Sequence, residues 1–322
     1  MDDVTAAKHL VRLLDLTSLN NDDTENRIEK LCAKAQTPYG NVAAVCIYPK
    51  FLPLAKSLLD GTSVKLATVV NFPDGGSDLS KVRAETEYAL EKGAVEIDAV
   101  FPYRNFLAGD YQTCADFVAL ISKITGKKHP SKIILETGVI EKAALIARAA
   151  GICIDNGANF IKTSTGKTPV SATPEAANVI LETVASGRRN VGFKASGGIK
   201  TIDDAKKYLV LANAIMGWKW ISPSNFRIGA SSLLDNLIEV IERGYLHDFS
   251  AAGNHSQKTQ PPNADRRRNR FFRQRHNRRF DCRRPNRCPD HGNFSERFFP
   301  RRNRRAYAEH ARFRRRAAMA GH

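Results

Sequence analysis

The last 69 residues of this 322-residue chain contain no leucine, isoleucine or valine, although they include seven phenylalanines. A segment without aliphatic side chains cannot fill a close-packed core, so we expect residues 251–322 to be disordered. The same 69 residues hold 21 basic and five acidic residues, which accounts for nearly all of the net charge of +17. Residues 1–250 are therefore expected to fold as a separate, nearly neutral domain.

Long apolar runs, a secretory signal and metal-ligand clusters are also missing. No stretch approaches the roughly 20 apolar residues that span a bilayer, and the acidic start of the chain is unlike a signal peptide. We therefore expect a cytoplasmic protein with reduced thiols and no membrane partner. The only histidines before residue 254, His9, His129 and His247, are far apart, and no zinc or magnesium ligand pattern is present in that part of the chain. We expect neither a metal nor a cofactor.

Short apolar runs of strand length alternate with stretches of helical spacing in residues 1–250. Eight runs predict strands, at residues 10–16, 41–48, 64–71, 95–101, 132–137, 160–164, 191–195 and 226–230. Helical spacing is clear at residues 78–92, 106–124, 139–156 and 174–186, and Thr173 and Thr201 are expected N-caps. Strict alternation implies a parallel sheet, either open and doubly wound or closed. The count of eight favours a (β/α)8 TIM barrel, and no GxGxxG follows the first run.

Two lysines lie inside predicted apolar strands. Lys162 follows Phe160 and Ile161, and Lys194 lies on the next strand. Alternation places Lys162 on the inner face of a barrel, where burial and a second ammonium group would lower the pKa of its amine. A neutral amine is what Schiff-base formation requires. The alternative is a lysine that reaches past the strand end to solvent.

Three further polar side chains interrupt apolar strands. Asp98 lies in mid-strand and Asp15 near the end of the first strand. A buried carboxylate needs partners, so each is interpreted either as a proton carrier or water-holding group, or as a structural ion pair with a lysine. Cys46 fits a small core residue, with a reactive role near the pocket as the alternative.

Glycine-rich turns follow the last three predicted strands. They comprise Gly166 and Lys167 after the sixth strand, Gly197 and Gly198 after the seventh, and Gly229, Ser231 and Ser232 at the end of the eighth. Backbone N–H groups in such turns and at a helix N-terminus bind phosphate. Barrels commonly place a phosphate after strands seven and eight. We therefore expect a phosphate site, although a Gly-Gly pair alone is often only a turn.

These segments resemble the signature segments of the deoxyribose-phosphate aldolase family. The matching residues are 15–17 (DLT), 46–49 (CIYP), 71–73 (NFP), 98–104 (DAVFPYR), 160–167 (FIKTSTGK), 192–201 (GFKASGGIKT) and 229–232 (GASS). The resemblance covers about residues 7–248. It implies a metal-independent class I aldolase that reversibly cleaves 2-deoxy-D-ribose 5-phosphate, in deoxyribose phosphate catabolism, and it is compatible with a homodimer.

The resemblance also implies roles for individual residues. Lys162 would form the Schiff base, with Asp98 and Lys194 assisting proton transfer. Lys167 and the glycine and serine turns would hold the phosphate. Asp15 and Thr165 would contact the sugar hydroxyls or the nearby loop. Some members of the family end in a catalytic tyrosine, and Tyr307, the one tyrosine after residue 253, has no matching context.

The Arg-rich segment allows three hypotheses. It could bind nucleic acid through arginines interleaved with phenylalanines, it could be a frameshifted C-terminus, or Cys282, Cys288 and His291 could form a small zinc module. The alternatives to the aldolase are correspondingly an impaired barrel that binds nucleic acid through this segment, or another Schiff-base sugar-phosphate aldolase.

Overall fold

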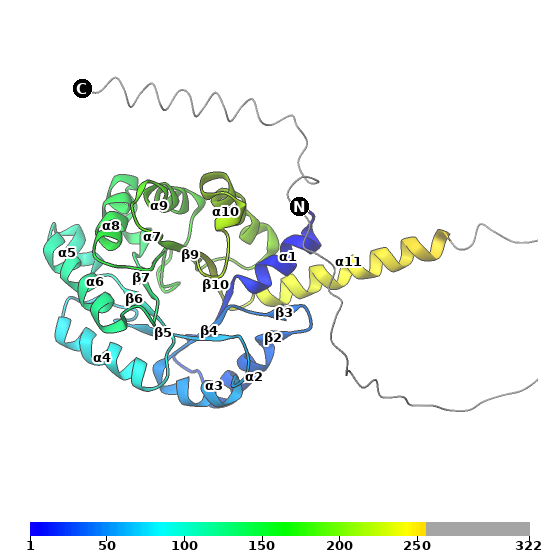
Figure 1. Cartoon of the computed structure of the whole chain (residues 1–322), viewed down its shortest axis with the longest axis horizontal. Coiled ribbons are helices and arrows are strands. Elements are labelled where there is room, and N and C mark those ends of the chain that lie inside the picture. The colour runs from blue at the N-terminus through cyan, green and yellow to red at the C-terminus, as the bar shows by residue number, and fades with distance from the viewer. Residues whose placement is uncertain (256–322) are drawn as a thin grey trace, which may run out of the picture. The chain divides into compact units, whose positions relative to one another are not determined.

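The computed structural model shows a closed barrel of eight parallel strands (Figure 1). It describes the backbone of residues 1–255 and the side chains of residues 1–245. The strands follow the order β1-β10-β9-β8-β7-β6-β5-β4 around the ring. They are β1 (Leu14–Thr17), β4 (Ala44–Ile47), β5 (Lys65–Val70), β6 (Glu96–Val100), β7 (Ser131–Ile134), β8 (Phe160–Lys162), β9 (Gly192–Ser196) and β10 (Phe226–Ala230). The predicted TIM barrel is confirmed, and the open doubly wound sheet is excluded.

Helices connect the strands and form the outer layer (Figure 1). They are α1 (Asp3–Arg12), α2 (Glu25–Lys34), α3 (Leu52–Leu58), α4 (Leu79–Glu91), α5 (Tyr103–Leu107), α6 (Tyr111–Thr125), α7 (Thr137–Ile140), α8 (Ala143–Asp155), α9 (Pro174–Ser186), α10 (Ile202–Met216) and α11 (Leu233–His255), with 3-10 turns at Pro49–Phe51 and Trp218–Trp220. Both predicted N-caps form. The Thr173 hydroxyl accepts a hydrogen bond from the Ala176 N–H, and Thr201 makes a capping box with Asp204.

The first predicted strand, residues 10–16, is partly wrong. α1 extends to Arg12 and β1 begins only at Leu14. Leu10 and Val11 are buried on α1, which packs beside α11 (Figure 1). A short apolar run has the same appearance in a buried helix and in a buried strand, so the periodicity could not separate the two.

Two of the predicted helices are interrupted, and one small sheet was not predicted. The stretch 106–124 contains the end of α5 and most of α6, separated at Gly109 with φ of 89°, and the stretch 139–156 contains the end of α7 and all of α8, separated at Glu141 with φ of 59°. A residue with positive φ cannot continue a right-handed helix. The short strands β2 (Gln36–Thr37) and β3 (Gly40–Asn41) form an antiparallel pair, and elements of two residues have no readable periodicity.

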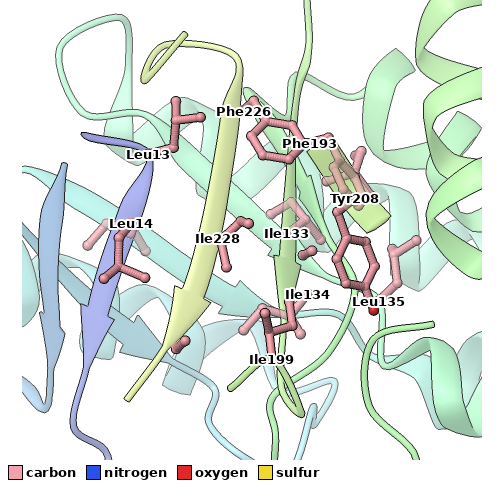
Figure 2. Close-up of a cluster of buried hydrophobic side chains, with 14 of the residues drawn as sticks. Leu13, Leu14, Ile133, Ile134, Leu135, Phe193, Ile199, Tyr208, Phe226 and Ile228 are labelled. Atoms are coloured by element: carbon pink, nitrogen blue, oxygen red, sulfur yellow. The ribbon is translucent and has the colours of Figure 1, made fainter. Parts of the chain in front are cut away.

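The barrel has two apolar clusters, one on each side of its wall. Outside, strands pack under the helices, and Figure 2 shows Phe193 and Phe226 in this cluster together with Tyr208 of α10. Inside, four small side chains of β4 and β5 form a second cluster with Leu19. These are Ala44, Cys46, Ala67 and Val69. The remainder of the inner face carries the charged side chains described below.

The C-terminal part of the chain is only partly described. The expected boundary at residue 250 falls within α11, and the segment that includes Cys282, Cys288, His291 and Tyr307 lies outside the described residues. The division into two domains, and each hypothesis on the Arg-rich segment, therefore stay predictions. None of the helices described in residues 1–255 combines the length and hydrophobicity that a membrane span requires.

Candidate active site

Lys162 and Lys194 lie side by side inside the barrel. Lys162 is the last residue of β8 and is in register with Lys194 of β9. Both side chains are buried, so Lys162 does not extend past the strand end into solvent. The sequence predicts that both lysines lie on the inner face of the barrel at the same height. The structure places them there.

Asp98 of β6 joins the two lysines. Its Oδ2 atom lies 2.8 Å from Nζ of Lys162 and 2.8 Å from Nζ of Lys194. Nζ of Lys194 also lies 2.6 Å from Oδ2 of Asp15 on β1. Asp15 and Asp98 are fully buried, so both carboxylates depend on these cations to stabilise their negative charge.

Three further charged residues complete this cluster, and sequence reasoning missed them. Lys132 of β7 contacts Glu96 of β6 at 2.6 Å and Oδ1 of Asp98 at 2.9 Å. Arg227 of β10 contacts both Asp15 and Glu96. Each of the three is a charged residue inside an apolar strand, which is the same signal that singled out Lys162. We call these seven side chains, Asp15, Glu96, Asp98, Lys132, Lys162, Lys194 and Arg227, the interior charge cluster.

The cluster shifts the pKa values of Lys162 and Lys194 in opposite directions. Burial lowers the pKa of the Lys162 amine; the Asp98 carboxylate opposes this shift, and the Lys194 ammonium group adds to it. Burial acts in the same sense on Lys194, but Asp15 and Asp98 outweigh it and raise the pKa of Lys194. Lys162 therefore loses its proton more readily than a free lysine, whereas Lys194 stays protonated.

The carboxylates of the cluster are held ionised. Burial by itself would raise the pKa of Asp98, but three lysines outweigh it and hold that pKa well below its ordinary value. The same opposition lowers the pKa of Asp15, where Arg227 is the strongest favourable partner. An ionised Asp98 can accept a proton or orient a hydrogen-bond donor beside the Lys162 amine.

A cavity of about 210 Å³ opens above Lys162 at the carboxyl ends of the strands. Its lining includes Lys162, Thr165 and every residue predicted to hold the phosphate, namely Gly166, Lys167, Gly197, Gly198, Gly229, Ser231 and Ser232. Gly166, Gly197 and Gly198 have φ between 79° and 91°, which glycine adopts without strain. Ser231 and Ser232 directly precede α11, so the helix N-terminus faces this cavity. Lys200, which was not predicted, also lines it.

The loop after β8 is held by a glutamate that was not predicted. Glu136, fully buried at a φ of 59°, accepts hydrogen bonds from the Thr165 N–H, the Thr165 hydroxyl and the Thr168 hydroxyl. Nζ of Lys167 donates to the carbonyl of Leu19 at 2.6 Å. Positive φ is uncommon for a residue other than glycine, but no motif in the sequence marks it. Glu136 thus positions the loop that carries Thr165 and Lys167.

Not all of the predicted residues reach the cavity. Asp15, Asp98 and Lys194 are absent from its lining and lie beneath Lys162 within the interior charge cluster. For Asp15 this placement does not support a direct contact with sugar hydroxyls, because Arg227 and Lys194 occupy its two oxygens. Cys46 is fully buried in the inner apolar cluster, as expected for a core residue, and burial raises the pKa of its thiol.

Comparison with known proteins identifies the family. Residues 10–237 match the family described as DeoC/LacD family aldolase. The chain belongs to this family. A deoxyribose-phosphate aldolase of Agrobacterium fabrum (strain C58 / ATCC 33970) is 47% identical to this aldolase over 240 residues, which cover 74% of this chain and 93% of that protein.

Solved structures show the same likeness. The aldolase QR15 superposes with a TM-score of 0.63 at 28% identity, covering 74% of this chain and 98% of its own. A tetrameric deoxyribose phosphate aldolase from Aeropyrum pernix superposes with a TM-score of 0.55 at 25% identity, covering 75% and 97%. The resemblance seen in the sequence motifs is confirmed, and the chain is an aldolase, a carbon–carbon lyase.

Proposed function

We propose that this aldolase reversibly cleaves 2-deoxy-D-ribose 5-phosphate to D-glyceraldehyde 3-phosphate and acetaldehyde through a Schiff base on Lys162. The observation that carries the proposal is a single cavity that joins the Lys162 amine to glycine turns and a helix N-terminus suited to phosphate. The name of the A. fabrum relative supports the same activity.

The first step joins the Lys162 amine to C1 of the open-chain sugar. The neutral amine attacks the aldehyde carbon, and loss of water from the adduct leaves a protonated imine. Lys194 stays protonated and shares Oδ2 of Asp98 with Lys162, each amine being 2.8 Å from that oxygen. Oδ2 of Asp98 can therefore relay the proton that Lys162 releases to the hydroxyl group, which leaves as water, while Lys194 assists by keeping its positive charge beside Asp98.

The protonated imine then accepts the electron pair of the breaking C2–C3 bond. The C3 hydroxyl loses its proton to a base, for which we propose a water held by Asp98, and glyceraldehyde 3-phosphate departs from a lysine-bound enamine. Protonation of C2 and hydrolysis release acetaldehyde and return the Lys162 amine. Because the imine is itself the electron sink, this route uses neither metal nor cofactor.

Binding of the phosphate orients the sugar. The ammonium groups of Lys167 and Lys200 and the backbone N–H groups around Gly197, Gly198 and Ser232 are the donors that the cavity offers. An anchored phosphate determines which carbon faces Lys162, so binding energy remote from the reacting bond is converted into orientation.

The cellular role and the assembly are also proposals. We infer a cytoplasmic role in deoxyribose phosphate degradation, and a homodimer as the assembly. The A. pernix relative is a tetramer, so light scattering on the full-length chain distinguishes these states.

Borohydride trapping tests the proposed function. The full-length chain is treated with acetaldehyde and borohydride, digested and mapped by mass spectrometry, with Lys162→Met as the control. An ethyl group on Lys162 is the expected result, and no label, or a label only on Lys194, overturns the assignment. Parallel trapping with dihydroxyacetone phosphate, together with cleavage assays on 2-deoxyribose 5-phosphate, separates the proposed activity from that of other Schiff-base sugar-phosphate aldolases.

A further inference from the structure

Lys132 lies at the centre of the interior charge cluster. It is fully buried on β7, and its Nζ lies 2.6 Å from Glu96, 2.9 Å from Asp98 and 3.9 Å from Asp15. It thus approaches all three carboxylates of the cluster, although it does not line the cavity above Lys162.

Lys132 and Lys162 bind opposite oxygens of one carboxylate. Lys132 binds Oδ1 of Asp98, whereas Lys162 and Lys194 share Oδ2. Two cations on the same carboxylate compete for its negative charge, and each reduces the stabilisation that the other receives. Lys132 therefore limits how strongly Asp98 stabilises the charged form of Lys162.

The formal charges of the cluster do not balance. Three carboxylates face four basic side chains, and three of these, Lys132, Lys194 and Arg227, each contact two or more carboxylates. Among the carboxylates of residues 1–245, Lys162 contacts that of Asp98 alone, and it shares Oδ2 with Lys194. The excess positive charge is thus relieved most easily at Lys162, because loss of its proton leaves the other three cations paired with three carboxylates.

The lower part of the cluster lies away from the cavity that Lys162 lines. Glu96 is the first residue of β6, and Glu96 and Arg227 line a separate cavity of about 760 Å³ at the amino ends of the strands. Lys162 lines the cavity at the carboxyl ends. A substitution at Glu96 can therefore change the charge beneath Lys162 without touching the substrate.

We propose that Lys132 and Glu96 are positioning residues that act on Lys162 in opposite senses: Lys132 keeps its amine free as a nucleophile, and Glu96 moderates that effect. The inference rests on the proposed function for its catalytic meaning. Lys132 and Glu96 would not contact the substrate, but they would control the protonation of Lys162, which does. Asp98, Lys194 and the thiol of Cys46 are the other titratable groups that face Lys162.

Two charge-removing variants test the proposal by the sign of their effects. Lys132→Met removes a competing cation, so Asp98 should stabilise the Lys162 ammonium more and the pH midpoint of Lys162 reactivity should rise by about one unit or more. Glu96→Gln removes a negative charge, so the midpoint should fall. The double variant Lys132→Met/Glu96→Gln again has one basic side chain more than it has carboxylates in the cluster. Its pH midpoint of Lys162 reactivity should therefore return toward that of the unchanged protein.

The readout is the pH dependence of Lys162 labelling by trinitrobenzenesulfonate, followed by peptide mapping of the full-length chain. Lys128→Met is the matched control, because Lys128 is exposed on the lower cavity and should leave the midpoint unchanged. If Lys132 and Glu96 had only a structural role, the Lys132→Met and Glu96→Gln variants would be less stable, but their pH midpoints of Lys162 labelling would not move in opposite directions. Equal midpoints in all variants, or shifts of the same sign, overturn the proposal.

Folding and the proposed activity are separated by further measurements. If Lys132→Met does not fold, Lys132→Arg keeps the charge and should keep the midpoint, and Glu96→Gln alone still decides the sign. If the pH midpoints of Lys162 labelling shift in opposite directions but the protein traps no acetaldehyde, the proposed function is refuted and the role of Lys132 and Glu96 is supported. If acetaldehyde is trapped on Lys162 but the midpoints do not move, the proposed function is supported and the role of Lys132 and Glu96 is refuted.

Discussion

The two sides of the barrel interior differ in kind. On β4 and β5 the inner face carries Ala44, Cys46, Ala67 and Val69, which fill space and need no polar partner. The strands from β6 through β10 to β1 carry the interior charge cluster. Buried ion pairs are often no more stabilising than well-packed apolar residues. Packing is therefore sufficient to explain the apolar residues of β4 and β5, whereas the interior charge cluster is explained by its proposed role in catalysis. Substitutions on the two sides should therefore have different effects on activity and stability.

Removal of Lys162 should abolish activity without loss of stability. Lys162→Met is expected to lower kcat/KM by about 10⁴-fold or more, because no Schiff base can form. The free energy of unfolding in urea should change by less than about 1 kcal/mol or rise, since the cation with the fewest carboxylate partners is removed. Lys194→Met, which leaves Asp15 and Asp98 short of a partner, should be clearly destabilised. Equal destabilisation of the two variants would refute the distinction.

Removal of Asp98 should unbalance the charged side. Asp98→Asn leaves four basic groups with two carboxylates, so we expect a loss of about 3–5 kcal/mol in the free energy of unfolding. Urea denaturation followed by circular dichroism measures it. Asp155→Asn, at the C-terminal end of α8 and away from the cluster, serves as a control. A loss below about 1 kcal/mol would mean that the cluster tolerates an unpaired excess of cations.

A cavity on the apolar side should affect stability alone. Val69→Ala removes two buried methyl groups and should lower the free energy of unfolding by about 1–3 kcal/mol. It changes no charge, so the pH midpoint of Lys162 labelling should match that of the unchanged protein. A shifted midpoint would show that the two sides of the interior are coupled.

The smallest expected effect is at the cavity mouth. Lys167→Met should raise KM for 2-deoxyribose 5-phosphate by about tenfold, the size of one charge-assisted hydrogen bond. Cleavage of unphosphorylated 2-deoxyribose should be unchanged, because Lys167 would contact only the phosphate. Steady-state kinetics with both substrates check this result, and an equal loss on both would place Lys167 at the reacting carbons instead.

Much of the fold and part of the site could be predicted from local patterns. Seven of the eight strands lie within the predicted runs or within two residues of them, because apolar runs and caps such as Thr201 act over short stretches of chain. The eighth, at residues 10–16, merged the end of α1 with β1. Lys162, Lys194 and Asp98 were found because charged residues are rare in apolar strands. Lys132 carried the same signal and was overlooked at the start of its strand.

The partners of these charges could not be predicted. Arg227 of β10 and Glu96 of β6 lie on opposite sides of the ring, 131 residues apart in sequence, yet NH2 of Arg227 is 2.8 Å from Glu96. Glu136 was missed for a similar reason, because its contacts with Thr165 and Thr168 span about 30 residues. No local pattern encodes such pairs.

Four features follow from the sequence alone: a nearly neutral barrel, the Arg-rich segment after it, two inner lysines on neighbouring strands, and glycine turns at the ends of those strands. Local alternation and turn chemistry are sufficient for those features. The carboxylate that each lysine contacts, and therefore the amine that loses its proton, depends on how the strands come together in space. Closure of the barrel and the register of its strands set the distances between charged groups across the interior. In a buried interior those distances determine which groups are protonated.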